Sequence, residues 1–167
     1  LLNLQIKIAN VESIFAESAL TSNHIEMPHG SYQEESMQAT IVPNRNMLFI
    51  SHAIAYAISK NIQRVWYGAH AGDHFIYPDC RPEFLSAMNS VAQKCHTFPI
   101  NIEAPFLNFS KAEILNLGLE LGLDYSKTWT CYEGKDLACG KCGSCNERLE
   151  AFTLNNFIDP LQYSEKN

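Results

Sequence analysis

Short apolar stretches alternate with helical patterns along this chain. Hydrophobic and polar residues alternate at positions 2–8 and again at positions 98–103, and this period of two predicts a half-buried strand at each place. Residues 64–70 form a more continuous apolar run that follows a helical segment after a tight link. Such a run is typical of a strand inside a parallel sheet. The order of elements therefore predicts an α/β fold with a parallel sheet.

Helical spacing of apolar residues recurs between the predicted strands. Ser110 and Glu113 form a capping box at the start of one helix, and Gly122 ends it. The predicted helical segments are 11–20, a stretch beginning after Asn44, 82–94, 110–121 and 146–155. The predicted buried face of the helix after Asn44 consists of Met47, Ile50, Ile54, Ala57 and Ile58, and that of helix 82–94 consists of Phe84, Leu85, Met88, Val91 and Ala92. In helix 110–121 the predicted buried residues are Ile114, Leu117 and Leu121, and in helix 146–155 they are Leu149, Phe152 and Leu154.

A long polar segment covers residues 21–40. Loops of more than about 12–15 residues in a compact domain are usually functional lids or disordered segments, and both interpretations stay open here. Pro43 and Asn44 end the loop and cap the next helix. Arg45 and Asn46 therefore fall in the first turn, where free backbone N–H groups suit an anion. Arg45 is either an anion-binding residue or an ordinary solvated surface arginine.

The composition fits one globular domain over residues 1–167. Hydrophobic residues make up 46% of the chain and charged residues 18%, which is sufficient for a proper core. The formal net charge of −6 argues against a broad electrostatic footprint for nucleic acid. No run approaches the roughly 18 apolar residues of a membrane span, and the start has no signal-peptide pattern. We therefore expect a cytoplasmic protein that binds neither nucleic acid nor membrane.

Polar and aromatic residues crowd the segment after the predicted strand at residues 64–70. Ligands in parallel sheets bind beyond the carboxyl ends of the strands, so a site is expected there. His70 and His74 give only a weak signal for a second metal, because nothing assures a helix between them. Lys111, in the first turn of its helix, is either a phosphate contact or an exposed lysine. The candidate polar residues after the strand are Asp73, Tyr77, Asp79 and Arg81.

Four cysteines near the C-terminus have metal-ligand spacing. They follow the pattern C-x7-C-x2-C-x2-C within residues 129–148, and Gly140 and Gly143 supply backbone freedom between them. Four thiolates hold zinc tetrahedrally and leave no position for water, so a structural zinc hook is favoured. An iron–sulfur cluster, two disulfides or unrelated buried thiols are alternatives, and no secretory signal supports the disulfides. The four residues are Cys131, Cys139, Cys142 and Cys145.

Several motifs together resemble the 7-cyano-7-deazaguanine synthase family. They are V-P-N-R-N-M at 42–47, H-A-G-D at 70–73, Y-P-D-C-R-P-E-F at 77–84, A-P at 104–105, K-A-E-I at 111–114, and T-C-Y-E-G followed by C-G-K-C-G-S-C-N-E-R in the hook. That family belongs to the N-type ATP pyrophosphatase superfamily and acts in queuosine-precursor synthesis. The resemblance covers nearly the whole chain with the motifs in the right order.

The resemblance implies a fold, a reaction and a set of partners. The fold is adenine nucleotide alpha hydrolase-like, a Rossmann-like parallel sheet with helices on both faces, and the complete enzyme is a homodimer. The reaction is an ATP-dependent ligation that converts 7-carboxy-7-deazaguanine and ammonia to the nitrile. The carboxylate is adenylated with loss of pyrophosphate, ammonia gives an amide, and a second activation by ATP dehydrates the amide. Zinc in the hook and magnesium with ATP are the expected metals.

Motif by motif, the resemblance also implies roles for individual residues. The four hook cysteines match the zinc ligands of the family. The residues at the helix start, in the loop after the strand and in the K-A-E-I motif match positions that we expect to contact nucleotide, acyl group or base. The expected catalytic residues are Arg45, Asp73 and Lys111, and the expected substrate-binding residues are Asn46, Tyr77, Asp79 and Arg81.

One family motif does not occur in this sequence. The pyrophosphate-binding loop S-G-G-x-D-S is missing, and no two glycines are adjacent. By register against the family, the chain is expected to be the C-terminal two-thirds of such an enzyme, truncated at the N-terminus and inactive alone. Two alternatives stay open: a non-catalytic zinc-stabilised module that binds a deazapurine, and a repurposed superfamily member that acts on protein or tRNA.

Overall fold

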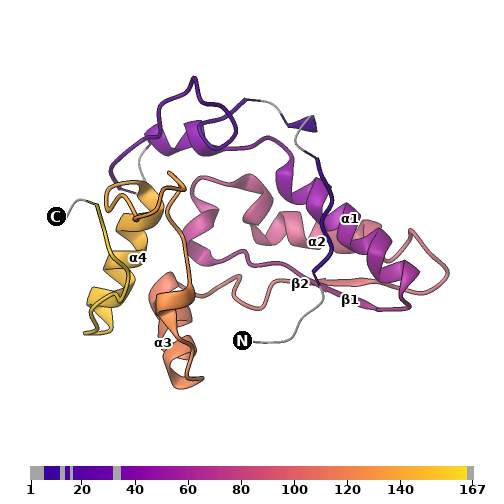
Figure 1. Cartoon of the computed structure of the whole chain (residues 1–167). Coiled ribbons are helices and arrows are strands. Elements are labelled where there is room, and N and C mark those ends of the chain that lie inside the picture. Colours follow the sequence, from indigo (N-terminus) through magenta and orange to yellow (C-terminus); the bar gives the residue numbers. More distant parts are fainter. Residues whose placement is uncertain (1–5, 12–13, 16, 32–34, 165–167) are drawn as a thin grey trace.

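A computed structural model describes residues 6–11, 14–15, 17–31 and 35–164. Two parallel strands, β1 (Arg64–Trp66) and β2 (Asn101–Glu103), pair in a register that sets Val65 opposite Ile102. Helix α1 (Arg45–Ser59) precedes β1, and α2 (Pro82–Ala92) connects β1 to β2 (Figure 1). The predicted α/β class with a parallel sheet is therefore confirmed.

The main core lies between the two strands and the two helices that accompany them. Val65 and Ile102 point to one face of the sheet, where α1 and α2 both pack (Figure 1). The opposite face of the strands carries exposed Arg64 and Trp66, whose indole N–H donates to Glu103 Oε2 at 2.6 Å. The buried residues of this core are Ile50, Ile54, Ala57, Val65, Met88, Ala92, Ile100 and Ile102.

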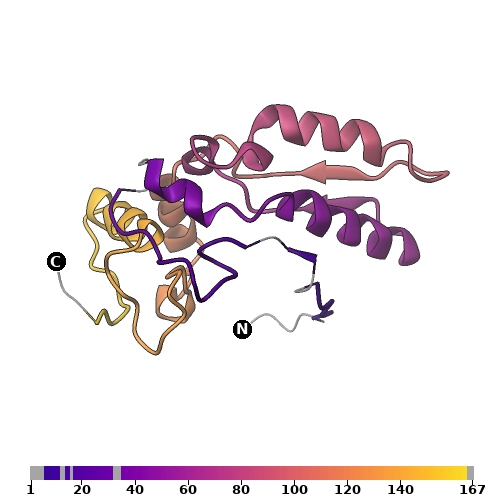
Figure 2. The same ribbon diagram turned by 90° about the horizontal axis from the view of Figure 1, so that it is seen from above.

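Two further helices, α3 (Lys111–Glu120) and α4 (Gly143–Leu154), pack against each other at the other end of the molecule (Figure 2). The predicted capping box is confirmed, because Ser110 Oγ accepts from the Glu113 N–H and the Glu113 carboxylate accepts from the Ser110 N–H. Gly122 follows α3 at a φ of +72°, the left-handed conformation expected after a helix end.

Short 3-10 helices shape the connections around the carboxyl end of β1. The predicted loop at 21–40 ends in η2 (Glu35–Thr40). The segment after β1 contains η3 (Ala71–His74) and η4 (Pro78–Cys80). A further turn, η5 (Tyr125–Lys127), leads from α3 toward the cysteine hook. Because of these turns, the polar segments that contain the candidate residues are folded and not extended.

The structure differs from the predictions for the first twenty residues. Most of the predicted strand at 2–8 lies outside the described residues, and the described part, residues 6–8, is exposed and not in a strand. In the predicted helix at 11–20, Ile14 alone of the described residues is in a helical turn. Ser18 explains part of this result, because its hydroxyl accepts from the Leu20 N–H and stabilises a local turn instead.

The predicted buried faces are shifted in several helices. Met47, Val91, Leu121 and Leu154 are exposed, although each was expected to be buried. In α3 the buried residues are Leu115 and Gly118. A Cβ at Gly118 would overlap the hydroxyl of Tyr125, which donates to Leu115 O at 3.0 Å. The approach of Tyr125, rather than apolar spacing alone, therefore decides which side of α3 faces inward.

A buried ion pair fixes the C-terminal segment to α4. Arg148 Nε and Nη2 donate to the two carboxylate oxygens of Asp159 at 2.6 and 2.9 Å. The two side chains are only 5% and 2% exposed. Arg148 also donates to Thr128 Oγ1 at 2.8 Å and to Tyr125 O at 3.1 Å. One guanidinium thus joins α4, the segment that enters the hook and the segment that leaves α4.

No helix in the described part of the chain is both long enough and apolar enough to cross a membrane.

Candidate functional site

A cavity of about 380 Å³ lies at the carboxyl end of β1. The start of α1, the segment after β1, η4 and the residue after the first hook cysteine form its walls. This is the position at which parallel α/β sheets bind ligands. It brings together four of the seven expected catalytic and substrate-binding residues. The lining residues are Arg45, Asn46, Phe49, Ile50, Tyr67, Gly68, Ala69, Asp73, Tyr77, Cys80 and Tyr132.

The N-terminus of α1 is capped from η4 rather than by its own N-cap residue. Asn44 has a φ of 62° and makes no side-chain cap. Instead, Asp79 Oδ2 accepts from the Asn46 N–H at 3.1 Å, and Asn46 Nδ2 donates to Asp79 O at 3.4 Å. Asn44 is the N-cap residue, as predicted, but the capping side chain is that of Asp79. Asp79 places a carboxylate at the helix end where a ligand anion was expected, and this fixes Asn46 in the cavity wall.

Asp73 is held in place by the turn that it begins. Its Oδ2 accepts from the His70 N–H at 3.2 Å, and its carbonyl accepts from the Tyr77 N–H at 2.9 Å. Burial lowers the pKa of His70 despite the opposing charge of Asp73, so the ring is neutral at pH 7. Nδ1 of that ring accepts from the Gly72 N–H at 3.1 Å. These bonds orient the Asp73 side chain on a rigid turn.

Two lining residues remain protonated at neutral pH. Burial, with the charges of Cys80, Asp79 and Asp73, raises the pKa of Tyr67 to about 12. Burial, with the charges of Asp73 and Asp79, also raises the pKa of Cys80 to about 12. A neutral thiol is a poor nucleophile, so the cavity suits binding and positioning rather than covalent attack by Cys80. Neither residue was among the sequence-based candidates.

A chain of hydroxyl groups crosses the cavity wall. Thr40 Oγ1 lies 2.6 Å from Tyr77 Oη, which lies 3.3 Å from Tyr132 Oη. Thr40 is fully buried and also donates to Met37 O at 2.6 Å. Of these three residues, Tyr77 alone was expected at the site from the sequence. Tyr132 directly follows the predicted metal ligand Cys131, and this position in the sequence could have identified Tyr132 as a residue of the site.

Arg81 and Lys111 do not line this cavity. Arg81 is exposed, and its Nε donates to His74 O at 2.8 Å, which closes the loop after β1. Lys111 Nζ forms an ion pair with Glu147 of α4. Lys111 and Glu147, together with Gly72, line a separate cavity of about 650 Å³. The structure thus gives Arg81 and Lys111 contacts that shape the surroundings of the site.

The four hook cysteines converge on one point. Their Sγ atoms all lie within 4.8 Å of one another, and all four residues are buried free thiols. Cys139 Sγ lies 3.9 Å from Cys145 Sγ. Zinc–sulfur bonds of about 2.3 Å require sulfur atoms about 3.8 Å apart in a tetrahedron. The donor set therefore fits a tetrahedral metal ion. In the described residues no other group of His, Cys, Asp or Glu converges in this way, and His70 and His74 form no such site.

Backbone N–H groups of the hook donate hydrogen bonds to the sulfur atoms that would bind a cation. The Cys142 N–H donates to Cys139 Sγ at 3.3 Å, and the Cys139 N–H donates to Cys131 Sγ at 3.3 Å. Donation from the Cys145 thiol, together with the Tyr132 N–H, lowers the pKa of Cys142. Gly140 has the expected positive φ of 79°. Gly143 does not, because it is the first residue of α4.

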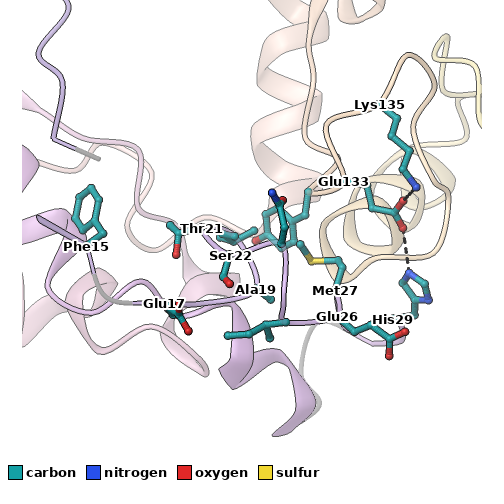
Figure 3. A pocket seen from close by; sticks show the side chains of 14 residues that line it. Phe15, Glu17, Ala19, Thr21, Ser22, Glu26, Met27, His29, Glu133 and Lys135 are labelled. Atoms are coloured by element: carbon teal, nitrogen blue, oxygen red, sulfur yellow. Dashed lines mark hydrogen bonds and ion pairs between the residues drawn. The ribbon is translucent and has the colours of Figure 1, made fainter. Parts of the chain in front are cut away.

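The N-terminal segment docks onto the hook and encloses a third cavity, of about 910 Å³. The Gly30 N–H donates to Lys141 O at 3.1 Å, and His29 pairs with Cys142 in an antiparallel bridge. Figure 3 shows Glu133 between His29 and Lys135, with an oxygen 3.1 Å from His29 Nε2. Residues far apart in sequence therefore hold the hook against the rest of the chain.

Fold and site together define an α/β protein with a cavity of small-molecule size beyond its parallel strands and a four-cysteine hook whose donor set fits a metal ion. The family model described as queuosine biosynthesis protein QueC matches residues 2–156. The 7-cyano-7-deazaguanine synthase 2 of Colwellia psychrerythraea is 54% identical over 166 residues, covering 98% of this chain and 76% of that protein.

Two other relatives agree with this match. The 7-cyano-7-deazaguanine synthase of Marinobacter nauticus is 55% identical, over 95% of this chain and 71% of that protein. The enzyme of the same name from Pseudoalteromonas translucida is 52% identical, over 95% of this chain and 72% of that protein. The chain belongs to the QueC family of queuosine biosynthesis proteins.

Proposed function

We propose that the protein is an ATP-dependent ligase that converts 7-carboxy-7-deazaguanine and ammonia to 7-cyano-7-deazaguanine. Adenylation turns the carboxylate oxygen into a leaving group, and ammonia displaces AMP to form the amide. A second ATP activates the amide oxygen, whose departure with AMP and loss of the nitrogen protons leaves the nitrile. Membership of the QueC family supports this activity over a binding module or an enzyme that acts on protein or tRNA.

The observation that carries the proposal is the grouping of Arg45, Asn46, Asp73 and Tyr77 around one cavity. Its volume of about 380 Å³ is in the range of small-molecule sites. Arg45 is the cationic residue among the lining side chains, so we assign it to the substrate carboxylate. Asp73 and the tyrosine hydroxyls suit the polar edge of the base. Asp79, Arg81 and Lys111 act in this proposal by fixing α1, the loop and α4.

Zinc is the metal that we propose for the hook. Four cysteine thiolates satisfy its tetrahedral preference and leave no open position, so the ion supports the fold and performs no chemistry. Its bonds would fix Cys131 and therefore the neighbouring Tyr132 in the cavity wall. We further propose that magnesium accompanies ATP, that residues 1–167 form one domain with the hook at 129–148, and that the enzyme works as a cytoplasmic homodimer without nucleic acid or membrane.

Substitution of Arg45 tests the assignment of the cavity. In the protein expressed from its complete reading frame, Arg45→Met is expected to raise the Kd for 7-carboxy-7-deazaguanine by about 10-fold to 100-fold, because a charge-assisted hydrogen bond is lost. Isothermal titration calorimetry measures the change. Arg64→Met is the matched control, because Arg64 lies on the exposed face of the sheet. Equal affinities of both variants and the wild type would remove Arg45 from the site.

A further inference from the structure

The chain after α4 turns back along that helix and reaches the cysteine hook (Figure 1). Residues 159–164 are called the C-terminal clasp below. Within it, Tyr163 pairs with Ala138 of the hook in a parallel bridge. The Ala138 N–H donates to Gln162 O at 3.2 Å, and the Ser164 N–H donates to Ala138 O at 2.8 Å. The clasp therefore binds both backbone groups of one hook residue.

A buried network of hydrogen bonds fixes the clasp to α4. The Asp159 carboxylate accepts from Arg148 at both of its oxygens, and Tyr163 Oη donates to Asp159 Oδ2 at 2.5 Å. The Leu161 N–H donates to Asp159 Oδ1 at 3.0 Å, which turns the chain between the two clasp residues. Arg148 lies three residues after Cys145, on the same side of α4. One carboxylate therefore connects the clasp to the helical turn that carries the last predicted metal ligand.

The side chain of Tyr163 covers the cysteines of the hook. The four cysteines are between 0% and 6% exposed, and in the described part of the chain three partly buried apolar side chains pack against their cluster. Tyr132 belongs to the hook itself, Met27 comes from the N-terminal segment, and Tyr163 comes from the clasp. An apolar shell around a metal site controls the access of solvent. Loss of the Tyr163 side chain would therefore open the cluster on the side of the clasp.

We propose that the C-terminal clasp limits the release of the metal ion from the cysteine hook, and that Tyr163 is the positioning residue of this device. The inference rests on the proposed function, because it takes zinc as the metal of the hook. An ion bound by four thiolates leaves after the sulfur atoms separate and a competing ligand reaches it. The clasp opposes both events, since it holds the hook backbone and covers the sulfur atoms. The family model matches residues 2–156, so the clasp lies outside that match.

The rate of zinc release tests this role in the zinc-loaded protein expressed from its complete reading frame. Excess 4-(2-pyridylazo)resorcinol captures the released zinc, and its absorbance gives the rate. Tyr163→Ala removes the ring and the hydroxyl, so release is expected to be at least about tenfold faster than in the wild type. Tyr163→Phe keeps the ring but loses the bond to Asp159, and about threefold faster release is expected. Tyr56 is an exposed residue of α1, so Tyr56→Ala keeps the wild-type rate.

A variant of the main core separates the clasp from general stability. Met88 is buried between α2 and the strands, in a cluster separate from the hook, so Met88→Ala is expected to lower Tm and to keep the wild-type rate of zinc release. Release from Met88→Ala as fast as from Tyr163→Ala would overturn the proposal. So would a wild-type rate in Tyr163→Phe, which decides the matter even if Tyr163→Ala does not fold. A wild-type protein that takes up no zinc would instead overturn the metal assignment of the proposed function.

Discussion

Replacement of Cys142 by serine is expected to release the metal and to lower the thermal midpoint of unfolding by at least about 10 °C. Structural zinc in zinc-finger peptides contributes on the order of 10 kcal/mol of apparent binding free energy, and each kcal/mol shifts Tm by about 2–4 °C in a chain of this size. Cys142 is fully buried, and its backbone and thiol connect to Cys139 and Cys145. Loss of this ligand therefore loosens the hook and the N-terminal segment that pairs with it at His29.

Cys95→Ser is the matched control for this experiment. Cys95 is an exposed thiol outside the cluster, so its replacement is expected to leave both zinc content and Tm unchanged. Elemental mass spectrometry and differential scanning calorimetry measure the two quantities. A Cys142→Ser variant with one zinc per chain and an unaltered Tm would rule out a structural metal at these cysteines.

Arg148→Met is expected to destabilise the fold by about 3–5 kcal/mol, because it leaves the carboxylate of Asp159 buried without its partner. Both side chains are almost inaccessible, and the guanidinium also bonds to Thr128 and Tyr125. The free energy of unfolding, measured by urea titration, reports the loss. The double variant Arg148→Met/Asp159→Leu is expected to recover part of it, since no unpaired charge remains.

A surface pair provides the comparison. Lys127 and Asp124 lie 2.8 Å apart with side chains 62% and 51% exposed. Lys127→Met is expected to change the stability by less than about 1 kcal/mol, because water replaces the lost contact. Equal effects of Lys127→Met and Arg148→Met would mean that burial does not determine the importance of the Arg148 pair.

Predictions that depend on local chemistry or spacing agree best with the structure. Ser110 and Glu113 form their capping box because both partners lie within one helical turn. The start of α1 after Asn44 and the convergence of the four cysteines follow in the same way from neighbouring residues. The parallel pairing of β1 and β2 was also accessible, because an apolar run separated from another strand by a helix leaves few topologies.

Predictions that depend on distant partners were less successful. The inward face of α3 is set by Tyr125, and the cap of α1 comes from Asp79, thirty-three residues away from Asn46. Tyr67 reaches the cavity only through the fold, although it shares the cavity with Arg45. Periodicity describes which residues share a helix side. It does not say which side another element will cover.

The connection between hook and cavity is the feature that joins stability to function in this protein. Tyr132 belongs to both, since it follows Cys131 and lines the cavity with Asp73 and Tyr77. The N-terminal segment holds the hook from the other side, through Gly30 and His29. A metal ion at four thiolates can therefore define the shape of a site in whose chemistry it takes no part.

Turnover with labelled ammonium tests the central claim most directly. The zinc-loaded protein from the complete reading frame is incubated with 7-carboxy-7-deazaguanine, ¹⁵N-ammonium, magnesium and ATP, and the products are identified by mass spectrometry. We expect 7-cyano-7-deazaguanine that carries the label, with two AMP formed for each nitrile and none of it formed without ATP. Failure to consume 7-carboxy-7-deazaguanine in the presence of ATP, ammonium and bound zinc would contradict the assignment of this chain as a nitrile-forming ligase.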